Sequence, residues 1–553
     1  MIKDWLEVCS TNHELCGCAL MEQELPKRLI DVGSEQSPFA HLRFTDGQKG
    51  VYVALSYCWG SSLETVTTTR ASLSRRMKGI EVESLPATFA DAIKVCRRLN
   101  MHFLWIDALC IVQDDLADWE AEASKMAEIY SHSVITISAT MASTPSQGFL
   151  RRRKAGLDPK LSWIHPVTHQ KGTLNIRSKG QAWIDLLSVD SPLMKRGWTL
   201  QERLLSPRVL HYGLHTFYWE CRECLRSEDP QFNRDLNPDE GEKDLGYRKF
   251  LKQSKNRWMI FEYWSSIVED YTSRHLSNEA DKLLAVSGLA HAVRLKTGDI
   301  YHAGLWQSCF ARELLWRRGS RDYMTKPSQY RAPSWSWAAL DGQVKTFDTS
   351  WPITPWMKGH LDDLKFEEAW EREFAVYQIK CKCNPENSLG KVENGWMDVS
   401  GPMRKAKHLE SGRQYELPRW LSGSVRRYLA DDIGVVYFLL DGGGPSGRLW
   451  TCVLDCEPDL AFPDRWWLLR IAVNIFLIED SSHSFQHWAL ILEYMGGEGQ
   501  EECYRRLGVA WIFASHSEIC EFRGVKPGES IDWEKAWELH SSSDWETKRV
   551  YII

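Results

Sequence analysis

Two kinds of apolar pattern alternate along the first part of the chain. Residues 87–99 and 115–131 repeat apolar side chains at about every third or fourth position, which predicts two amphipathic helices. Near-continuous apolar or β-branched runs predict buried strands near 51–57, 103–109 and 134–139. This alternation predicts an α/β domain with a mainly parallel sheet.

The pattern changes further along the chain. Residues 196–221 predict a short helix followed by two strands, and a helical period dominates from about 245 to 317. From residue 331 onward, short runs of β-forming residues are separated by Gly, Pro, Ser and acidic turns, which predicts a β-rich domain. The predicted strands there are 451–456, 466–478, 487–494, 505–514 and 548–553.

The composition is that of a globular protein with several domains. The chain has 553 residues, of which 43% are hydrophobic and 26% charged, and this excludes wholesale disorder. A formal net charge of −6 provides no global basic field, so we expect neither a nucleic-acid nor a membrane partner. The changes of pattern predict four parts: an N-terminal leader (1–44), the α/β domain (45–225), a helical region (226–330) and the β-rich C-terminal domain (331–553).

The N-terminus and the cysteines favour a protein of the cytosol or the nucleus. The first 20 residues mix acidic with apolar residues, so we predict no signal peptide. The apolar run 466–478 contains Arg470 and Asn474 and is too short and too polar to span a bilayer. With no export signal expected, the 15 cysteines are predicted to be reduced thiols.

Three segments resemble one known family. They are YVALSYCWG (52–60), LWIDALCIVQDDLADWEAEASKMAEIYSHS (104–133) and RGWTLQERLLSPRVLHYG (196–213). In this order they resemble the HET domain, the heterokaryon-incompatibility domain of filamentous fungi. The resemblance implies a cytoplasmic fungal protein of non-self recognition and programmed cell death. It also implies a remote similarity to TIR domains, a flavodoxin-like α/β fold found both as an adaptor and as an NAD⁺-cleaving enzyme.

Glu122 is the main candidate for a catalytic residue. Trp119, Ala123, Met126 and Tyr130 form the apolar stripe of the predicted helix 115–131, and Glu122 lies beside that stripe. A carboxylate at the edge of a core is costly unless it is paired or functional. The alternative is a structural Glu that pairs with a cation or with backbone amides. TIR enzymes carry their catalytic Glu on a helix in a similar Trp-to-Glu context, which places Trp119 in the expected substrate site.

Further candidates follow the predicted strands. Ser56, Tyr57 and Trp59 end the first strand, and ligands of parallel sheets bind outside the carboxyl ends of strands. These residues would bind ribose, phosphate or base, or they form a tight turn with core aromatics. Asp107 interrupts an apolar run and either holds a ribose hydroxyl or caps a loop. Glu202 is a second candidate acid, with a structural ion pair as its alternative.

Several other kinds of chemistry are disfavoured. Cys9, His13, Cys16 and Cys18 are metal-ligating types, but their spacing is unorthodox, and the distant pair Cys221 and Cys224 would have to fold onto them. They also suit one face of a short helix, so we predict no metal site. Cys110 is expected to be a small core residue. The chain has no P-loop, Rossmann glycine fingerprint, HExxH or GxSxG motif.

Three functions remain open at this stage. The first is an enzyme that cleaves the nicotinamide–ribose bond of NAD⁺, with NAD⁺ as substrate and no cofactor. The second is a non-catalytic adaptor that signals death by self-association and contact with a protein partner in non-self recognition. The third is a regulatory protein whose β-rich region recognises a partner. The first needs a cleft with an unshielded Glu122, whereas the second needs a large exposed interface and is compatible with a salt-bridged Glu122.

Overall fold

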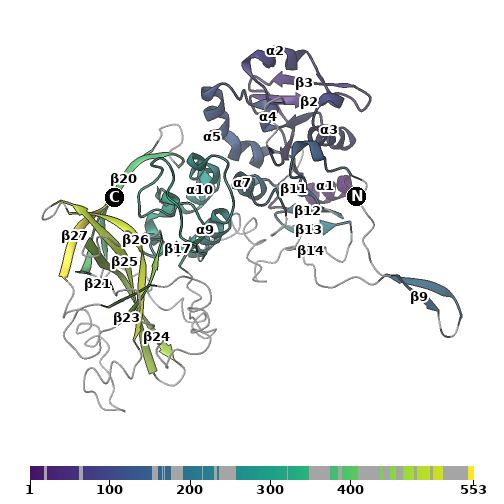
Figure 1. Ribbon diagram of the computed structural model, residues 1–553. Helices are drawn as coiled ribbons and strands as arrows, with labels where there is room; N and C mark the ends of the chain where they lie inside the picture. Colours follow the sequence, from purple (N-terminus) through teal and green to yellow (C-terminus); the bar gives the residue numbers. More distant parts are fainter. Residues whose placement is uncertain are drawn as a thin grey trace. The chain divides into compact units, whose positions relative to one another are not determined.

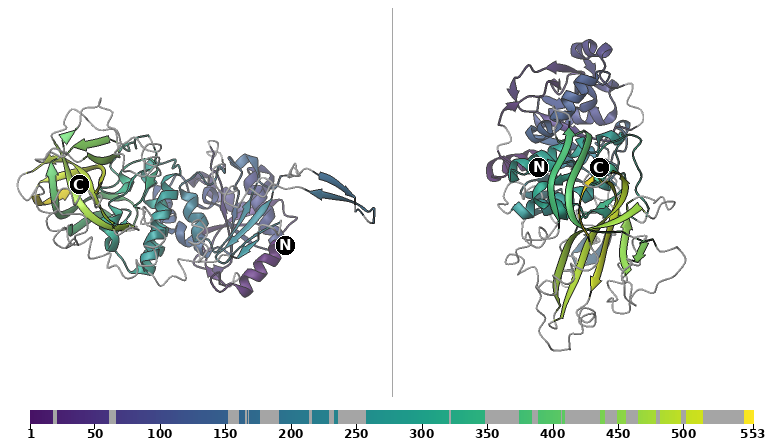
Figure 2. Two further views of the ribbon diagram at one scale, coloured as in Figure 1. Left: turned by 90° about the horizontal axis from the view of Figure 1, so that it is seen from below. Right: turned by 90° about the vertical axis from the view of Figure 1, so that its left-hand side faces the viewer.

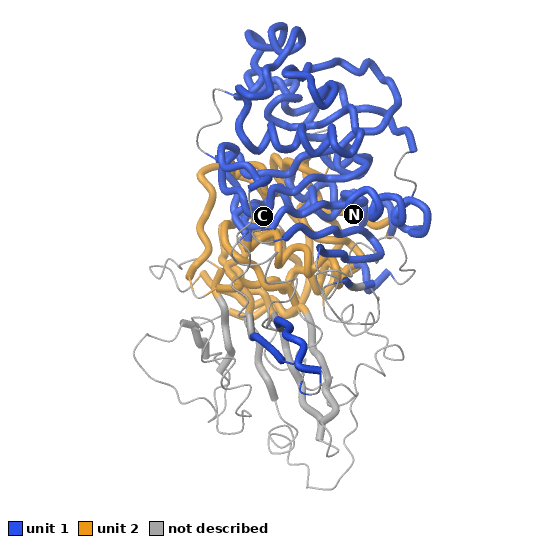
Figure 3. Tube along the Cα trace, turned by 90° about the vertical axis from the view of Figure 1, so that its right-hand side faces the viewer, with its two compact units in different colours: residues 1–260, 274–277, 284–296 blue, residues 261–273, 278–283, 297–553 orange. Residues whose placement is uncertain are grey.

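The computed structural model describes most of the chain. The described residues are 1–17, 21–60, 66–151, 160–164, 166, 168–175, 191–213, 216–228, 233–235, 257–320, 322–347, 374–383, 389–405, 407–408, 436–439, 449–455, 465–478, 482–497, 502–514 and 546–553. The chain divides into two compact units (Figure 3). Unit 1 comprises residues 1–260, 274–277 and 284–296, and unit 2 comprises residues 261–273, 278–283 and 297–553. The four-part division stays a prediction.

A ten-stranded sheet forms the centre of unit 1 (Figure 1). From one edge to the other its strands are β14 (Arg234–Asp235), β13 (Cys224–Ser227), β12 (Phe217–Cys221), β11 (Arg208–Tyr212), β8 (Ile135–Ser138), β5 (Val53–Ser56), β7 (Phe103–Trp105), β2 (Arg28–Asp31), β3 (Phe39–Phe44) and β6 (Ile80–Glu81). The described part of unit 1 also contains the antiparallel pairs β1 (Gln23–Glu24) with β4 (Lys49–Gly50), and β9 (Lys160–Ile164) with β10 (Lys171–Asn175).

The prediction of a mainly parallel sheet is wrong, because this sheet is mixed. Strands β7, β5, β8 and β11 pair in parallel, whereas the described strands on both flanks pair antiparallel. The reason lies in the connections. Short links join β2 to β3 and β11 to β12, and a short link can return the chain only antiparallel, since parallel neighbours need a long crossover. The α/β class is confirmed, but a flavodoxin-like sheet is not.

The helices of unit 1 follow the predicted periodicity. They are α1 (Ile2–Asn12), α2 (Arg70–Lys78), α3 (Ala87–Leu99), α4 (Asp107–Cys110), α5 (Leu116–His132), α7 (Trp198–Leu205) and α10 (Leu284–Thr297). The predicted helices 87–99 and 115–131 are confirmed as α3 and α5. Asp115 is the N-cap of α5, since its side chain accepts a hydrogen bond from the Asp118 amide.

Helix α10 packs closely on the two helices that carry the candidate acids. A Cβ added at Gly288 would lie 2.4 Å from Cβ of Ala127 on α5 and 2.9 Å from Oε1 of Gln201 on α7. Glycine at this position therefore permits a close approach that a larger side chain would prevent. The contact fixes α5 and α7 relative to each other within unit 1.

Unit 2 combines a helical segment with a β-rich region, as predicted. Apart from α9 and the large C-terminal sheet, its described short elements are α11 (Phe310–Glu313) and two antiparallel strand pairs. These pairs are β15 (Tyr301–His302) with β16 (Leu305–Trp306), and β17 (Arg317–Arg318) with β18 (Val344–Lys345). Helix α9 (Arg257–Thr272) begins in unit 1 and continues into unit 2. No helix in the described part of the chain has the length and apolar character needed to cross a bilayer.

A nine-stranded sheet makes up the C-terminal region. Eight strands follow in the order β19 (Ala375–Cys383), β20 (Val392–Lys405), β24 (Trp466–Ile478), β25 (Ser482–Gly496), β26 (Cys503–Ala514), β23 (Leu449–Leu454), β22 (Val436–Leu439) and β21 (Lys407–His408). The ninth, β27 (Glu546–Ile552), pairs with β20 and β26, which confirms the predicted last strand. Strands β24, β25 and β26 lie side by side as long antiparallel neighbours (Figure 2).

Candidate functional site

Four predicted site residues meet at the carboxyl ends of the parallel strands. Ser56 is the last residue of β5, with Tyr57 and Trp59 just beyond it, and Asp107 begins α4 shortly after β7. Tyr57 Oη donates to Asp107 Oδ1 over 2.8 Å, and Trp59 Nε1 donates to Asp107 Oδ2 over 2.6 Å. Asp107 Oδ1 also accepts the amide of Ala108 at 2.6 Å. Asp107 therefore orients both aromatic side chains at the start of the short helix.

The predicted strand 103–109 is too long at its C-terminal end. Strand β7 ends at Trp105, and the apolar run continues as the one-turn helix α4 and not as strand. Burial raises the pKa of Asp107 above its usual range, while the hydrogen bonds from Tyr57 and Trp59 favour the charged form. A half-buried carboxylate held by aromatic donors at a sheet edge is a suitable anchor for a polar ligand.

Glu202 on α7 belongs to the same cluster. Its Oε2 accepts a hydrogen bond from Ser56 Oγ, and the side chain is 6% exposed. Burial raises the pKa of Glu202 to about 7, with a smaller contribution from the nearby charge of Asp107, whereas Arg196 acts in the opposite direction. Arg196 also donates from Nη1 to the carbonyl oxygen of Tyr57 at 3.0 Å. The sequence did not single out Arg196, although it opens the segment 196–213.

The raised pKa of Glu202 predicts that the stability of the folded protein depends on pH. The carboxyl pKa rises from 4.5 to about 7 in the folded protein. Between these two pH values the folded protein therefore keeps a proton that the unfolded chain has released. Stability should therefore fall as pH rises from about 4.5 to 7, by about 3 kcal/mol in total, at about 1.4 kcal/mol per pH unit. Urea unfolding at low and neutral pH should show this loss in wild type and not in Glu202→Gln. The exposed Glu128→Gln variant is the control, and equal pH slopes in all three proteins would contradict the assignment.

Glu122 lies in a different environment on α5. It is 1% exposed, its Oε2 has no hydrogen-bond partner, and burial raises its pKa. The charges that act on it are Arg28, which is itself ion-paired with Asp118, and then Asp118, Lys125 and Lys27. Among the described residues, no hydrogen bond or ion pair joins Glu122 to the cluster around Asp107. The predicted stripe is confirmed, with Ala123, Met126 and Tyr130 buried and Trp119 half-buried.

A buried ionic network supports α7 from the adjacent strands. Arg203 donates to both carboxylate oxygens of Glu220, at 2.9 and 3.2 Å, and Nε2 of His211 lies 2.8 Å from Glu220 Oε2. His211 Nδ1 lies 3.4 Å from Oγ1 of Thr140, just past β8. Glu220 and His211 are each 1% exposed. The network thus fixes the helix that carries Glu202 against the sheet.

The cysteines divide into two groups. Cys110 is fully buried, and burial raises its pKa to about 12, which keeps the thiol protonated as expected of a core residue. Cys221, by contrast, lies against Cys9, His13 and Cys16, so the distant segment does fold onto the N-terminal one. Cys18 lies outside the described residues. These four residues can hold a metal and are considered below.

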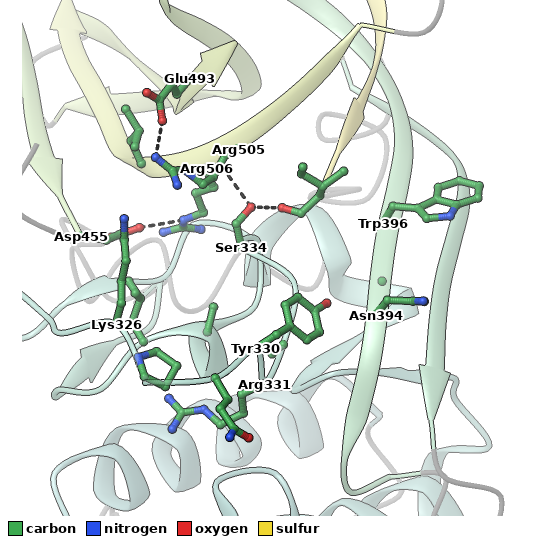
Figure 4. Close-up of a pocket in the computed structure, with 18 of the residues that line it drawn as sticks. Lys326, Tyr330, Arg331, Ser334, Asn394, Trp396, Asp455, Glu493, Arg505 and Arg506 are labelled. Atoms are coloured by element: carbon green, nitrogen blue, oxygen red, sulfur yellow. Dashed lines mark hydrogen bonds and ion pairs between the residues drawn. The ribbon is translucent and has the colours of Figure 1, made fainter. Parts of the chain in front are cut away.

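Unit 2 contains a separate cavity of about 680 Å³ (Figure 4). Its arginines are paired within the protein: Arg506 Nε lies 2.9 Å from Asp455 Oδ2, and Arg505 Nη2 lies 2.5 Å from Glu493 Oε2. The lining also contains polar side chains such as Lys326 and Asn394, together with apolar and aromatic ones, among them Tyr330, Leu340, Trp396 and Trp466. The volume suits a small organic molecule.

Comparison with known proteins finds one family that matches part of the first unit. The family model described as heterokaryon incompatibility protein (HET) matches residues 52–202, a range that contains Ser56, Asp107, Glu122 and Glu202. Neither the search of curated proteins nor the search of solved structures found a significant match. The matched range covers the parallel strands β5, β7 and β8 and the helix α5, and it ends within α7. The chain therefore carries a heterokaryon-incompatibility (HET) domain over residues 52–202.

Proposed function

We propose that the HET domain is a death effector that cleaves NAD⁺ at the nicotinamide–ribose bond, with Glu122 as the essential carboxylate. The domain itself indicates a role in heterokaryon incompatibility. The enzymatic hypothesis needs an accessible Glu122, and the side chain is instead only 1% exposed; the observation that supports the proposal is that its Oε2 has no hydrogen-bond partner. A polar atom buried without a partner costs stability, and such costs concentrate at functional sites.

The chemistry requires little beyond one carboxylate. The bond between ribose C1′ and the nicotinamide nitrogen breaks, its electron pair stays on nicotinamide, and positive charge develops on the ribose. A nearby carboxylate stabilises that charge or traps it, as in glycoside hydrolysis. Water then adds at C1′ and releases one proton, which yields ADP-ribose. Since nicotinamide leaves as a neutral molecule, no general acid is needed.

The cluster at the strand ends would bind the rest of the substrate. Ser56, Tyr57 and Asp107 offer polar groups for ribose and phosphate, Trp59 offers an aromatic face, and Arg196 would supply a cation for the phosphates. Trp119, on α5 beside Glu122, would offer a second aromatic face. Tyr57 and Trp59 are held in place by Asp107. A dinucleotide is long enough to contact this cluster and a second place on the same domain.

The burial of Glu122 predicts that the dilute protein is silent. At 1% exposure the carboxyl group cannot contact a substrate, and burial raises its pKa, which opposes the charged form that the reaction needs. Self-association that moves the side chains covering α5 would expose Glu122 and remove the desolvation that raises its pKa. This requirement links the proposed cleavage of NAD⁺ to self-association of the protein, which the adaptor hypothesis also requires.

The test is NAD⁺ consumption by the purified full-length protein over a concentration series. We expect nicotinamide and ADP-ribose in equal amounts, and a rate per chain that rises with protein concentration. A folded protein that consumes no NAD⁺ at any concentration, including after enforced clustering through a fused dimerisation tag, would contradict the proposal.

A further inference from the structure

Four metal-ligating side chains from two distant segments converge at the end of β12 in the sheet of unit 1. Cys9 lies on α1, His13 directly follows that helix, Cys16 lies in the next turn, and Cys221 ends β12. Their ligand atoms all lie within 4.8 Å of one another. Helix α1 lies against β12 (Figures 1 and 2), which brings the two segments together.

The spacing of the ligand atoms fits a tetrahedral zinc ion. His13 Nδ1 lies 3.4 Å from Cys221 Sγ and 3.9 Å from Cys16 Sγ. With zinc–sulfur bonds of about 2.3 Å and zinc–nitrogen bonds of about 2.0 Å, neighbouring corners of a tetrahedron lie about 3.5–3.8 Å apart. The cysteines are free and not joined in disulfides, and Cys9, Cys16 and Cys221 are at most 5% exposed.

The surroundings supply donors to the sulfur atoms. Arg208 Nε donates to Cys9 Sγ at 3.2 Å, and its side chain also donates to the carbonyl oxygens of Cys16 and Gly17. The amide of Cys224 donates to Cys221 Sγ at 3.3 Å. Donors of this kind stabilise thiolate charge and orient ligands around a metal, whereas a cluster of neutral core thiols does not require them.

The two segments are also held together without the cluster. The Leu15 amide donates to Glu223 Oε1 at 2.6 Å, and Arg222 donates to the Leu15 carbonyl at 2.9 Å. The Trp5 ring packs edge-on against Phe217, with ring centroids 5.6 Å apart. The ligands are therefore preorganised, and a metal ion would not have to draw the segments together.

We propose that Cys9, His13, Cys16 and Cys221 bind one structural Zn²⁺ ion. Thiolate and imidazole ligands select zinc among the common divalent ions, and four protein ligands close the coordination shell, which leaves no position for a substrate. The ion fixes the N-terminal segment to the hairpin β12–β13, whose Glu220 positions α7. Cys224, with its Sγ 3.5 Å from that of Cys221, is a neighbouring thiol outside the ligand set. This site is independent of the proposed cleavage of NAD⁺.

Metal analysis of the full-length protein, purified under reducing conditions without chelator, tests the proposal. We expect one zinc per chain in wild type and well below one in Cys221→Ala. The matched control is Cys96→Ala, a fully buried cysteine on α3, which should retain zinc. Cys224→Ala should also retain it, and loss of zinc in Cys224→Ala but not in His13→Ala would overturn the ligand set.

Cobalt substitution keeps the test decisive if Cys221→Ala does not fold. Wild-type protein refilled with Co²⁺ should show the intense visible bands of tetrahedral cobalt and the charge-transfer absorption of thiolate ligands. Chelation should lower its thermal midpoint, and added zinc should restore it. Folded wild-type protein with neither zinc nor a tetrahedral cobalt spectrum, or with these cysteines joined in disulfides under reducing conditions, would overturn the proposal.

Discussion

Glu122→Gln is expected to lower the rate of NAD⁺ cleavage about 100- to 1000-fold, the usual cost of removing one preorganised group that stabilises transition-state charge. The substitution keeps the shape of the side chain and removes its charge. Because the carboxyl group is buried and its Oε2 has no partner, the folded protein should be as stable as wild type or more so. The rates of cleavage should be measured at equal protein concentrations, above the threshold for activity.

Two further variants make this result specific. Glu120→Gln changes an exposed carboxylate on the same helix and should leave the rate unchanged. Glu202→Gln removes the other buried acid of the domain, which interacts directly with Ser56. If Glu202→Gln abolished cleavage while Glu122→Gln kept the wild-type rate, the essential carboxylate would be Glu202, and our assignment would be wrong.

Glu220→Ala is expected to destabilise unit 1 by about 3–5 kcal/mol, because it leaves Arg203 and His211 buried without their shared anion. For a unit of this size the loss corresponds to a fall of roughly 10 °C in the midpoint of its thermal transition. Differential scanning calorimetry measures the shift, with the exposed Glu81→Ala as control. A midpoint within about 2 °C of wild type would contradict the structural importance of this network.

The parts of the fold that local patterns determine could be predicted from the sequence. Helices α3 and α5 follow from their apolar period, and Asp115 is the N-cap because its short acidic side chain reaches the amide of Asp118. Strand β24 covers the predicted residues 466–478. In each case neighbours in sequence are also neighbours in the structure, so periodicity carries the information.

Features that depend on distant partners could not be predicted. The flanks of the first sheet are antiparallel because hairpin links decide their direction, and apolar runs do not encode direction. Asp107 was expected either to cap a loop or to bind a ribose hydroxyl. Its contacts with Tyr57 and Trp59 depend on which strand lies beside β7. Cys221 lies more than 200 residues from Cys9, Cys16 and His13, so spacing alone argued against a metal site.

The separation of Glu122 from the strand-end cluster was equally invisible in the sequence. Helical periodicity places Glu122 beside a core stripe, and it is indeed buried. The stripe does not reveal which cations act on the carboxyl group of Glu122. The main one is Arg28 from β2, and not Arg196. That difference explains why the proposal requires a rearrangement around α5 before Glu122 meets a substrate.

The most direct test of the account measures NAD⁺ and viability together in cells that express wild-type protein or Glu122→Gln at equal levels. The account predicts that NAD⁺ falls before viability in cells with wild type, and that neither falls with Glu122→Gln. If cells died with both proteins while NAD⁺ stayed constant, the HET domain would act as an adaptor and the enzymatic account would be contradicted.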